Sequence, residues 1–313
     1  MNKVLIADSV SSAVSEVFDK NGIAYDTKIG LSEDELATEI TEYSGLIVRS
    51  AVTVTEKIIN SASNLKVIGR PGVGVDNVDL KAATNNGIVV MNTPLGNVQA
   101  TAELTFGIMH SLMRKISNAN QSMHQKKWEK KKFIGNEMYG KTIGIIGFGN
   151  IGKKVSQIAH AYGMNVLVYS ASISPEDEKK LNVTNQSIDD ILEGADIITF
   201  HNKLSENSKY LINSNAITKM KKNAIIINCA RGGLVNEKDI KEALEKGNIA
   251  GYGCDVYENE PEQDSIFSSM DNVVMTPHIG ASTIEAQEKV AYQIAEQIVE
   301  FLKNNKIINQ VNK

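Results

Sequence analysis

The fold is decided by one stretch of the chain, Ile143-Gly144-Ile145-Ile146-Gly147-Phe148-Gly149-Asn150-Ile151-Gly152. Its apolar first half is typical of a buried strand, and its second half carries the spacing Gly-x-Gly-x-x-Gly before a helical pattern at 151–161. In that context Gly147 permits a tight turn, Gly149 lets a pyrophosphate approach the backbone, and Gly152 lets helix and strand pack closely. The stretch therefore predicts a dinucleotide-binding turn, with the phosphates at the N-terminus of the helix.

Strand-like and helix-like segments alternate along most of the chain. In the first part, apolar runs stand at residues 4–7, 23–27, 45–48, 67–69 and 88–91, and serines open helical patterns at 11–20 and 32–41. A long helical pattern at 98–118 is followed by further apolar runs at 142–146, 165–169, 196–200, 224–228, 249–254 and 273–275. Strands separated by helices predict βαβ units and parallel sheets. We therefore expect an α/β fold made of two doubly wound parallel-sheet domains.

The boundary between these domains is expected near Asn97, where the long helical pattern interrupts the alternation. The helical stretch at 282–303 is long enough to return to the first domain, which makes that domain discontinuous. We expect a flavodoxin-like substrate, or lid, domain from residues 1–97 plus 285–313. Residues 98–284 are expected to form a Rossmann dinucleotide-binding domain.

Composition restricts the classes of function. The chain has 313 residues, of which 42% are hydrophobic and 22% charged, and its net charge of −4 gives no reason to expect a nucleic-acid partner. Cys229 and Cys254 have neither the spacing of a disulfide framework nor that of a zinc site, so no metal is expected. The N-terminal apolar run is too short for a secretory signal, and no run approaches a membrane span. We expect a cytoplasmic protein that does not bind membranes.

Three polar residues each follow a predicted strand of the second series. Arg231 follows 224–228, and a guanidinium binds a carboxylate through two parallel hydrogen bonds. His278 follows 273–275, and imidazole is the side chain best suited to exchange a proton near neutral pH. Glu260 follows 249–254, and a carboxylate beside an imidazole fixes its tautomer and stabilises its charged form. Because the carboxyl ends of parallel strands face the ligand crevice, the trio predicts an acid–base site for an anionic substrate.

Two further positions concern ligands. Gly72-Val73-Gly74 also follows a strand-like run but has Asn77 where the fingerprint requires a third glycine, so its backbone amides suit a substrate anion instead. At the end of the run 165–169, Ser170 stands where an acidic residue normally binds the ribose hydroxyls of NAD. The sequence thus leaves the choice between NAD and NADP open.

Taken together, the motifs resemble those of the D-isomer-specific 2-hydroxyacid dehydrogenase family over essentially the whole chain. The stretches that carry the resemblance are 46–50, 67–78, 128–133, 140–147 and 277–283. The resemblance implies that Arg231 holds and polarises the substrate, that His278 is the acid/base, and that Glu260 is its partner. It also implies a homodimer formed through the long helical pattern.

The same resemblance implies the remaining site residues. The cofactor-binding set is Gly147, Gly149, Asn150, Ile151, Gly152, Ser170, Cys229, Ala230, Asp255 and Gly280, with Asp255 contacting the nicotinamide carboxamide. The substrate anion is expected at Arg49, Ser50, Val73 and Gly74. For a substrate phosphate, Arg49, Arg70 and the lysine-rich segment around Trp128 are alternatives, although such a charge run is more often a solvated helix end.

The implied reaction is oxidation of a D-2-hydroxy acid to the 2-keto acid, with 3-phospho-D-glycerate going to 3-phosphohydroxypyruvate for serine biosynthesis. The alternatives are a glyoxylate or hydroxypyruvate reductase, another D-2-hydroxyacid dehydrogenase, and a dinucleotide-sensing binding protein without turnover. Two residues depart from the family pattern: Ser170 replaces the acid, which makes NADP an option beside NAD, and Lys203 replaces a proline near the adenine side. Since the resemblance ends with the catalytic body, we expect no serine-sensing C-terminal domain.

Overall fold

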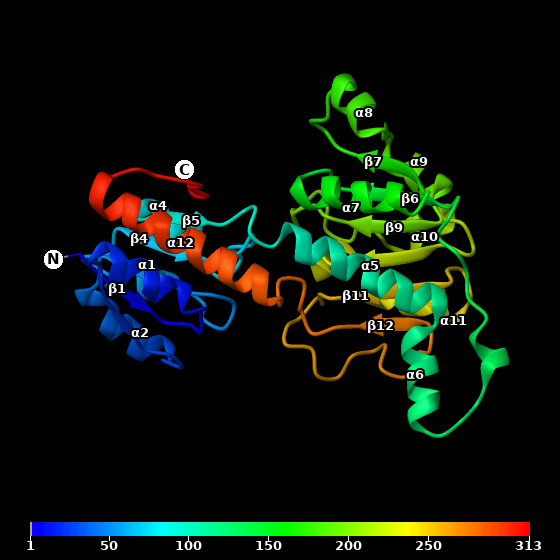
Figure 1. The fold of residues 1–313 in the computed structure, drawn as a ribbon, viewed down its shortest axis with the longest axis horizontal. Coiled ribbons are helices and arrows are strands. Elements are labelled where there is room, and N and C mark those ends of the chain that lie inside the picture. Colours follow the sequence, from blue (N-terminus) through cyan, green and yellow to red (C-terminus); the bar gives the residue numbers. More distant parts are fainter. Residues whose placement is uncertain (1) are drawn as a thin grey trace. The chain divides into compact units, whose positions relative to one another are not determined.

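The computed structural model describes residues 2–313, which form two compact units (Figure 1). One unit holds the chain up to Val98 together with Ala281–Lys313, and the other holds Gln99–Gly280. The sequence-based boundaries between the two domains lie after residues 97 and 284, whereas the units divide after residues 98 and 280. Within the described part of the chain, no helix is long and apolar enough to cross a membrane.

The first unit is built on a five-stranded parallel sheet in the order β2-β1-β3-β4-β5. Its strands are β1 (Lys3–Ile6), β2 (Ala24–Thr27), β3 (Gly45–Ile47), β4 (Val67–Arg70) and β5 (Val89–Asn92). This is the strand order of flavodoxin-like sheets, as predicted. Buried strands of this kind are almost entirely apolar because helices cover both faces.

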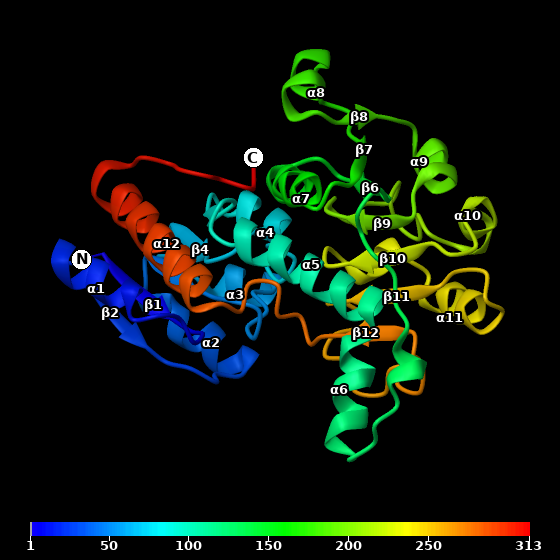
Figure 2. The same cartoon turned by 45° about the vertical axis from the view of Figure 1, so that its right-hand side comes forward.

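Helices of the first unit form two layers. One face is covered by α1 (Ala13–Asn21) and α12 (Ile284–Asn304), which lie side by side in Figures 1 and 2 and share an apolar core with β1 and β4. The other face carries α2 (Glu33–Glu39), α3 (Glu56–Ser61) and α4 (Leu80–Asn85). The predicted helix at 11–20 begins later, at Ala13, whereas Ser32 caps α2 through a complete capping box.

The outer edge of β5 is covered by the C-terminal tail. The amide of Val311 donates to the carbonyl of Val90 (2.9 Å), and the Asn312 side chain accepts from the Val90 amide (2.7 Å). Met91 and Gln310 form an antiparallel bridge. The tail therefore satisfies backbone groups that an edge strand would otherwise expose.

The second unit has a seven-stranded parallel sheet in the order β12-β11-β10-β9-β6-β7-β8. Its strands are β6 (Thr142–Ile146), β7 (Asn165–Tyr169), β8 (Thr184–Asn185), β9 (Ile197–Phe200), β10 (Ile225–Asn228), β11 (Gly251–Cys254) and β12 (Val273–Met275). Read from β8 to β11 the order is that of a Rossmann sheet, to which β12 adds a strand. The predicted fold class is therefore confirmed for both units, although the short polar strand β8 escaped prediction.

Helices cover both faces of this sheet too. An apolar core on one face joins α5 (Val98–Arg114) and α7 (Asn150–Ala161) to the strands. The other face carries α9 (Ile188–Gly194), α10 (Ser214–Lys219) and α11 (Glu237–Glu245), while α8 (Pro175–Leu181) lies beyond β7. This packing leaves the loops at the carboxyl ends of the strands to carry the chemistry.

The single helix predicted at 98–118 is wrong. It is two helices, because α5 ends at Arg114, Lys115 adopts a left-handed φ of 54°, and α6 (Ile116–His124) follows. The carbonyl of Met113 accepts a hydrogen bond from the Asn136 amide (2.8 Å), and Gly135 packs directly against the same carbonyl. A distant segment thus takes the bond that would have continued the helix.

Candidate active site

The glycine turn lies between β6 and α7 and is shaped by close backbone contacts. Gly147 has φ +97°, and a Cβ at this position would overlap the backbone of His201 and Asn202 after β9. A Cβ at Gly152 would overlap the Gly147 carbonyl. Gly149 has no atom near its Cβ direction and is the N-cap of α7, so open space adjoins the helix N-terminus where Asn150 and Ile151 begin the first turn. These residues fit a dinucleotide pyrophosphate.

Arg231 follows β10 in a turn organised by Asn228. The buried Asn228 side chain donates to the Arg231 carbonyl (2.9 Å) and accepts from the Ala230 amide (3.1 Å). Cys229 and Ala230 lie within this turn and are buried. The half-buried Arg231 donates from Nη1 to the Ala230 carbonyl (2.6 Å). The sequence pattern alone gave no role to Asn228, whose amide fixes the backbone that presents the guanidinium.

The turn that holds Arg231 lies against the loop that holds Glu260. A Cβ at Gly232 would overlap the carbonyl of Tyr257 and the amide of Glu258. Only a residue without a side chain permits this approach. Gly232 therefore lets two loops that are separate in sequence meet at the edge of the sheet.

Glu260 and His278 form a hydrogen-bonded pair, with 2.6 Å between Glu260 Oε2 and His278 Nδ1. The second oxygen of Glu260 accepts from the Tyr257 amide (3.0 Å). The His278 side chain is 51% exposed, so its ring remains accessible to a substrate. Glu260 and His278 thus lie together, as predicted. The carboxylate binds Nδ1 of the ring, which leaves Nε2 available for proton exchange.

Electrostatics adapt this pair to proton transfer. The hydrogen bond from Glu260 raises the pKa of His278 above its ordinary value, against the opposing effects of burial and of Arg231. Burial favours a higher pKa for Glu260, but the hydrogen bond and charge of His278 outweigh it, and the pKa of Glu260 is lowered. The pair therefore favours a carboxylate beside an imidazolium, which is the arrangement that stabilises the charged acid.

A second histidine at the same edge behaves differently. His201 follows β9, and its Nε2 lies 3.1 Å from the Thr199 hydroxyl while its Nδ1 is buried without a hydrogen-bond partner. Burial lowers the pKa of His201 to about 3. His201 is therefore neutral near pH 7 and unsuited to proton exchange there, in contrast to His278.

Asp255 holds the loop that carries His278. Its buried carboxylate accepts from the Thr276 hydroxyl (2.6 Å) and from the amides of Ile279 and Gly280 (both 2.7 Å). Between these anchors His278 has a φ of 52°, a conformation that few residues with a side chain adopt. Burial raises the pKa of Asp255. The sequence predicted only a cofactor contact here, because the anchoring depends on residues far along the chain.

Ser170 follows β7, at the position where an acidic residue normally binds the ribose hydroxyls of NAD. The Ser170 amide donates to the Asn185 side chain (3.1 Å), and the Asn185 side chain donates back to the Ser170 carbonyl (3.3 Å). The carboxylate of Glu178 accepts from the Asn185 amide (2.9 Å). Lys203 follows β9 and is exposed. Ser170 and Asn185 thus present neutral side chains here, and the carboxylate of Glu178 is bonded to the backbone of Asn185.

The predicted anion-binding residues of the first unit follow β3 and β4. Arg49 and Ser50 lie in a loop whose backbone is fixed by Asp8, since the Asp8 carboxylate accepts from the amides of Arg49 (3.0 Å) and Ala51 (3.1 Å). Val73 and Gly74 lie in the loop after β4, where the Asn92 side chain donates to the Val73 carbonyl (2.6 Å). Asp8 and Asn92 were not predicted, because each acts on a neighbouring strand's loop.

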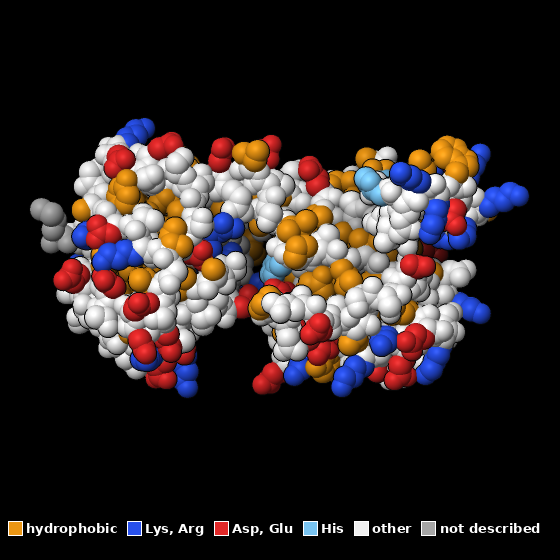
Figure 3. Space-filling model, turned by 90° about the horizontal axis from the view of Figure 1, so that it is seen from below, with side chains coloured by type: hydrophobic (Ala, Val, Ile, Leu, Met, Phe, Trp, Pro, Cys, Tyr) orange, Lys and Arg blue, Asp and Glu red, His pale blue; other side chains and the backbone are white. Residues whose placement is uncertain are grey.

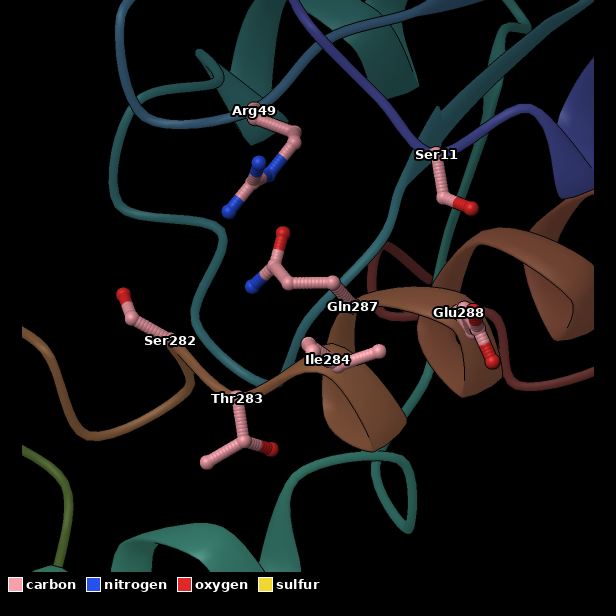
Figure 4. Close-up of a pocket in the computed structure, with 7 residues that line it drawn as sticks. All are labelled: Ser11, Arg49, Ser282, Thr283, Ile284, Gln287 and Glu288. Carbon is pink, nitrogen blue, oxygen red and sulfur yellow. The ribbon is translucent and has the colours of Figure 1, made fainter.

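A cavity of about 510 Å³ adjoins Arg49 within the first unit (Figure 4). Its polar lining combines Arg49 with the Gln287 amide and the hydroxyls of Ser11, Ser282 and Thr283, and Glu288 also borders it. In Figure 4 the guanidinium of Arg49 and the amide of Gln287 extend toward one another. Thr283 caps the long helix α12, whose N-terminus faces this region. The Gln287 nitrogen donates to the Ala281 carbonyl (2.6 Å), so the guanidinium and the hydroxyls are the donors that suit an oxyanion.

No cluster of His, Cys, Asp or Glu side chains suited to a metal ion occurs among residues 2–313.

Comparisons with known proteins agree with this geometry. A family model described as "D-isomer specific 2-hydroxyacid dehydrogenase, NAD binding domain" matches residues 106–280. The chain is 42% identical to D-3-phosphoglycerate dehydrogenase of Bacillus subtilis, over 100% of this chain and 59% of that protein. It is 45% identical to D-3-phosphoglycerate dehydrogenase of Synechocystis, over 96% of this chain and 54% of that one. The chain therefore spans a little over half the length of these curated relatives.

A solved structure of NAD⁺-bound 3-phosphoglycerate dehydrogenase from Entamoeba histolytica is also similar. The two share 28% identity and a TM-score of 0.84, over 100% of this chain and 99% of the other. The resemblance that the sequence motifs indicated is thereby confirmed at the level of the family.

Proposed function

We propose that this chain, which belongs to the D-isomer-specific 2-hydroxyacid dehydrogenase family, oxidises a D-2-hydroxy acid to the 2-keto acid with a nicotinamide dinucleotide. One observation carries the proposal: the hydrogen-bonded pair of Glu260 and His278 stands at the same sheet edge as the glycine turn and Arg231. Acid–base pair, guanidinium and dinucleotide turn are the groups that hydride transfer on a hydroxy acid requires.

In the proposed reaction, Arg231 holds the substrate carboxylate and polarises the oxygen on C2. His278 Nε2 takes the proton of the C2 hydroxyl while Glu260 holds Nδ1 and stabilises the imidazolium that forms. The glycine turn would hold the dinucleotide, which would supply the acceptor for the hydride from C2, so that the alcohol, having lost one proton and one hydride, would become a ketone. In the reverse direction the imidazolium of His278 returns the proton to the carbonyl oxygen.

The proposed substrate is 3-phospho-D-glycerate and the product 3-phosphohydroxypyruvate, a step of serine biosynthesis. The names of the full-coverage relatives support this choice. The cavity at Arg49 supports it as well, since its guanidinium and hydroxyl donors suit a phosphate. Glu288 borders the same cavity and opposes a dianion, which favours an unphosphorylated acid such as hydroxypyruvate as the second candidate.

The proposed nucleotide is NAD, with weak discrimination against NADP. The family model and the NAD⁺-bound relative support NAD. The corner made by Ser170 and Asn185 supports tolerance of NADP. Ser170 stands where an acidic residue is expected, and its neutral side chain does not repel a 2′-phosphate. Replacement Ser170→Asp should raise the KM for NADP several-fold and leave the KM for NAD equal or lower. An unchanged ratio of the two KM values would contradict this role for the corner.

We also propose a homodimer formed through the second unit and a cytoplasmic location. Figure 3 shows apolar side chains at the surface of that unit, and several large ones fall within one segment: Ile116, Met123, Trp128, Ile134 and Tyr139 are each more than half exposed. A concentration of large exposed apolar side chains in one segment favours an interface there. Both cysteines are buried free thiols, which suits a reducing compartment. Light scattering on Trp128→Glu beside the wild type measures the predicted loss of the dimer.

One assay matrix tests the reaction. 3-Phosphoglycerate, glycerate and D-lactate are each offered with NAD and NADP, and glyoxylate and hydroxypyruvate with the reduced nucleotides. We expect 3-phosphoglycerate with NAD to give the highest kcat/KM. Activity confined to unphosphorylated acids would reject the phosphoglycerate assignment and favour the reductase. Binding of NADH without turnover of any acid would instead favour a dinucleotide-sensing protein.

A further inference from the structure

Tyr257 lies in the loop after β11 and forms hydrogen bonds to Glu260 and to the turn that carries His278. Its amide donates to Glu260 Oε1 (3.0 Å). Its phenol hydroxyl donates to the Thr276 carbonyl (2.9 Å), and the same carbonyl accepts from the amide of His278 (3.0 Å). One residue therefore joins the carboxylate loop to the histidine loop.

The backbone of Tyr257 is held from its other side. Gly232 packs directly on the Tyr257 carbonyl, so the residue is enclosed between the Arg231 turn and the Glu260 loop. Its ring is half-buried and packs against the apolar core of that face of the sheet. A phenylalanine would fill the same space, so packing alone does not require the hydroxyl. This hydroxyl interacts with the Cys254 thiol and donates to the Thr276 carbonyl, which also holds His278.

We propose that Tyr257 is a positioning residue, whose hydroxyl holds the Thr276–His278 turn so that the imidazole stays aligned with Glu260. His278 needs such a hold because its backbone lies in the left-handed region. Asp255 anchors the turn at Thr276, Ile279 and Gly280, on either side of His278, and Tyr257 adds a side-chain bond to the Thr276 carbonyl that also accepts from the His278 amide. The catalytic part of the inference rests on the function proposed above.

Tyr257→Phe is the direct test, because it removes the hydroxyl and keeps the ring and the amide bond to Glu260. Tyr210→Phe is the matched control, since its hydroxyl donates to Glu258 Oε2 (3.1 Å) in the same loop but contacts neither Glu260 nor the histidine turn. Both variants lose one phenolic hydrogen bond to the same region. Only Tyr257→Phe should affect the acid–base pair.

The first readout is the pKa of His278, measured by NMR titration of its ring protons and assigned with His278→Asn. The charged groups that face this ring are Glu260, Asp255 and Arg231, and all three remain in both variants. A looser turn weakens the hydrogen bond that raises the pKa of His278, so Tyr257→Phe should lower this pKa. Tyr210→Phe should leave it unchanged. Equal pKa values in Tyr257→Phe and the wild type would overturn the proposal.

The second readout is kinetic. In Tyr257→Phe, kcat should fall about threefold to tenfold, as expected for one hydrogen bond of ordinary net strength, while the KM for the nucleotide stays constant. In a Glu260→Gln background the same substitution should have a smaller effect, because the alignment it maintains has then lost its partner. If Tyr257→Phe lowers kcat by the same factor in the Glu260→Gln background as in the wild type, the result counts against the proposal. The NMR titration needs no substrate, so it separates this inference from failure of the proposed reaction.

Discussion

Gly147-Phe148-Gly149 follows β6 in the second unit, and Gly72-Val73-Gly74 follows β4 in the first. After Gly149 the helix α7 begins at once, whereas after Gly74 the next helix does not begin until Leu80. Gly147 rests on backbone from the neighbouring strand, while a Cβ at Gly72, with φ +138°, would overlap the Arg70 guanidinium. The same three-residue pattern thus gives a helix N-terminus for a diphosphate in one unit and a loop beside a cation in the other.

The loops next to the two glycine turns also carry different functional groups. In the second unit the neighbouring loops carry an acid–base pair and a guanidinium, held by Asp255 and Asn228. In the first unit they carry hydrogen-bond donors around Arg49, held by Asp8. From this difference we propose that the second unit supplies the chemical step and holds the reacting end of the substrate, and that the first unit contributes further anion binding. Variants should therefore separate into those that change kcat and those that change KM.

The largest effect is expected for His278→Asn. Asparagine tolerates the left-handed backbone at this position but cannot exchange the proton, so kcat should fall about 10²- to 10⁴-fold with little change in the KM of the substrate. Steady-state kinetics in both directions measure this, and a thermal melt checks the fold. Turnover close to that of the wild type would remove the chemical step from the second unit.

Gly232→Ala should come next. The added methyl overlaps the Tyr257–Glu258 backbone, so the Arg231 and Glu260 loops must separate, and a shift of about 1 Å costs on the order of 100-fold in rate. Gly233→Ala is the control, because its methyl would meet only the flexible Leu204 side chain, at 3.1 Å. If both alanine variants lose activity equally, close approach at Gly232 is not the reason for the loss.

Arg49→Gln probes the first unit. Loss of a charge-assisted hydrogen bond to a phosphate should raise the KM for 3-phosphoglycerate about tenfold to 100-fold and leave kcat nearly unchanged. The KM for D-glycerate, which lacks the phosphate, serves as the internal control and should not move. A fall in kcat as large as that of His278→Asn would erase the distinction between the units.

The smallest predicted effect is a shift in pH dependence. Oxidation needs the neutral imidazole, so it should be lost as pH falls through the raised pKa of His278. Reduction needs the imidazolium and should be lost as pH rises through the same pKa. Glu260→Gln removes the main cause of the raised value, so the alkaline limit of reduction should move down toward 6.5. Profiles of kcat against pH for both proteins measure the shift, and coincident profiles would contradict the role of Glu260.

The sequence predicted those parts of the molecule that rest on local patterns. Apolar runs and helical periodicity indicated both sheets, and the residues after each strand indicated Arg231, Glu260 and His278. The groups that hold them were not predictable in this way. Asp255 acts on amides more than twenty residues later, and Asp8 acts on the loop after another strand, so each depends on the completed topology. The break after Arg114 escaped for the same reason, because residues 135–136 cause it.

The tail on β5 has a consequence for the order in which the chain folds during synthesis. Asn312, whose side chain binds the Val90 amide, is synthesised 222 residues after Val90. Helix α12 must also be synthesised before the apolar core around α1 is complete. Until then the edge of β5 is open to pairing with other chains. The second unit is continuous in sequence and carries no such delay. We expect it to become resistant to protease on the ribosome before the first unit does, although the first unit begins to emerge earlier.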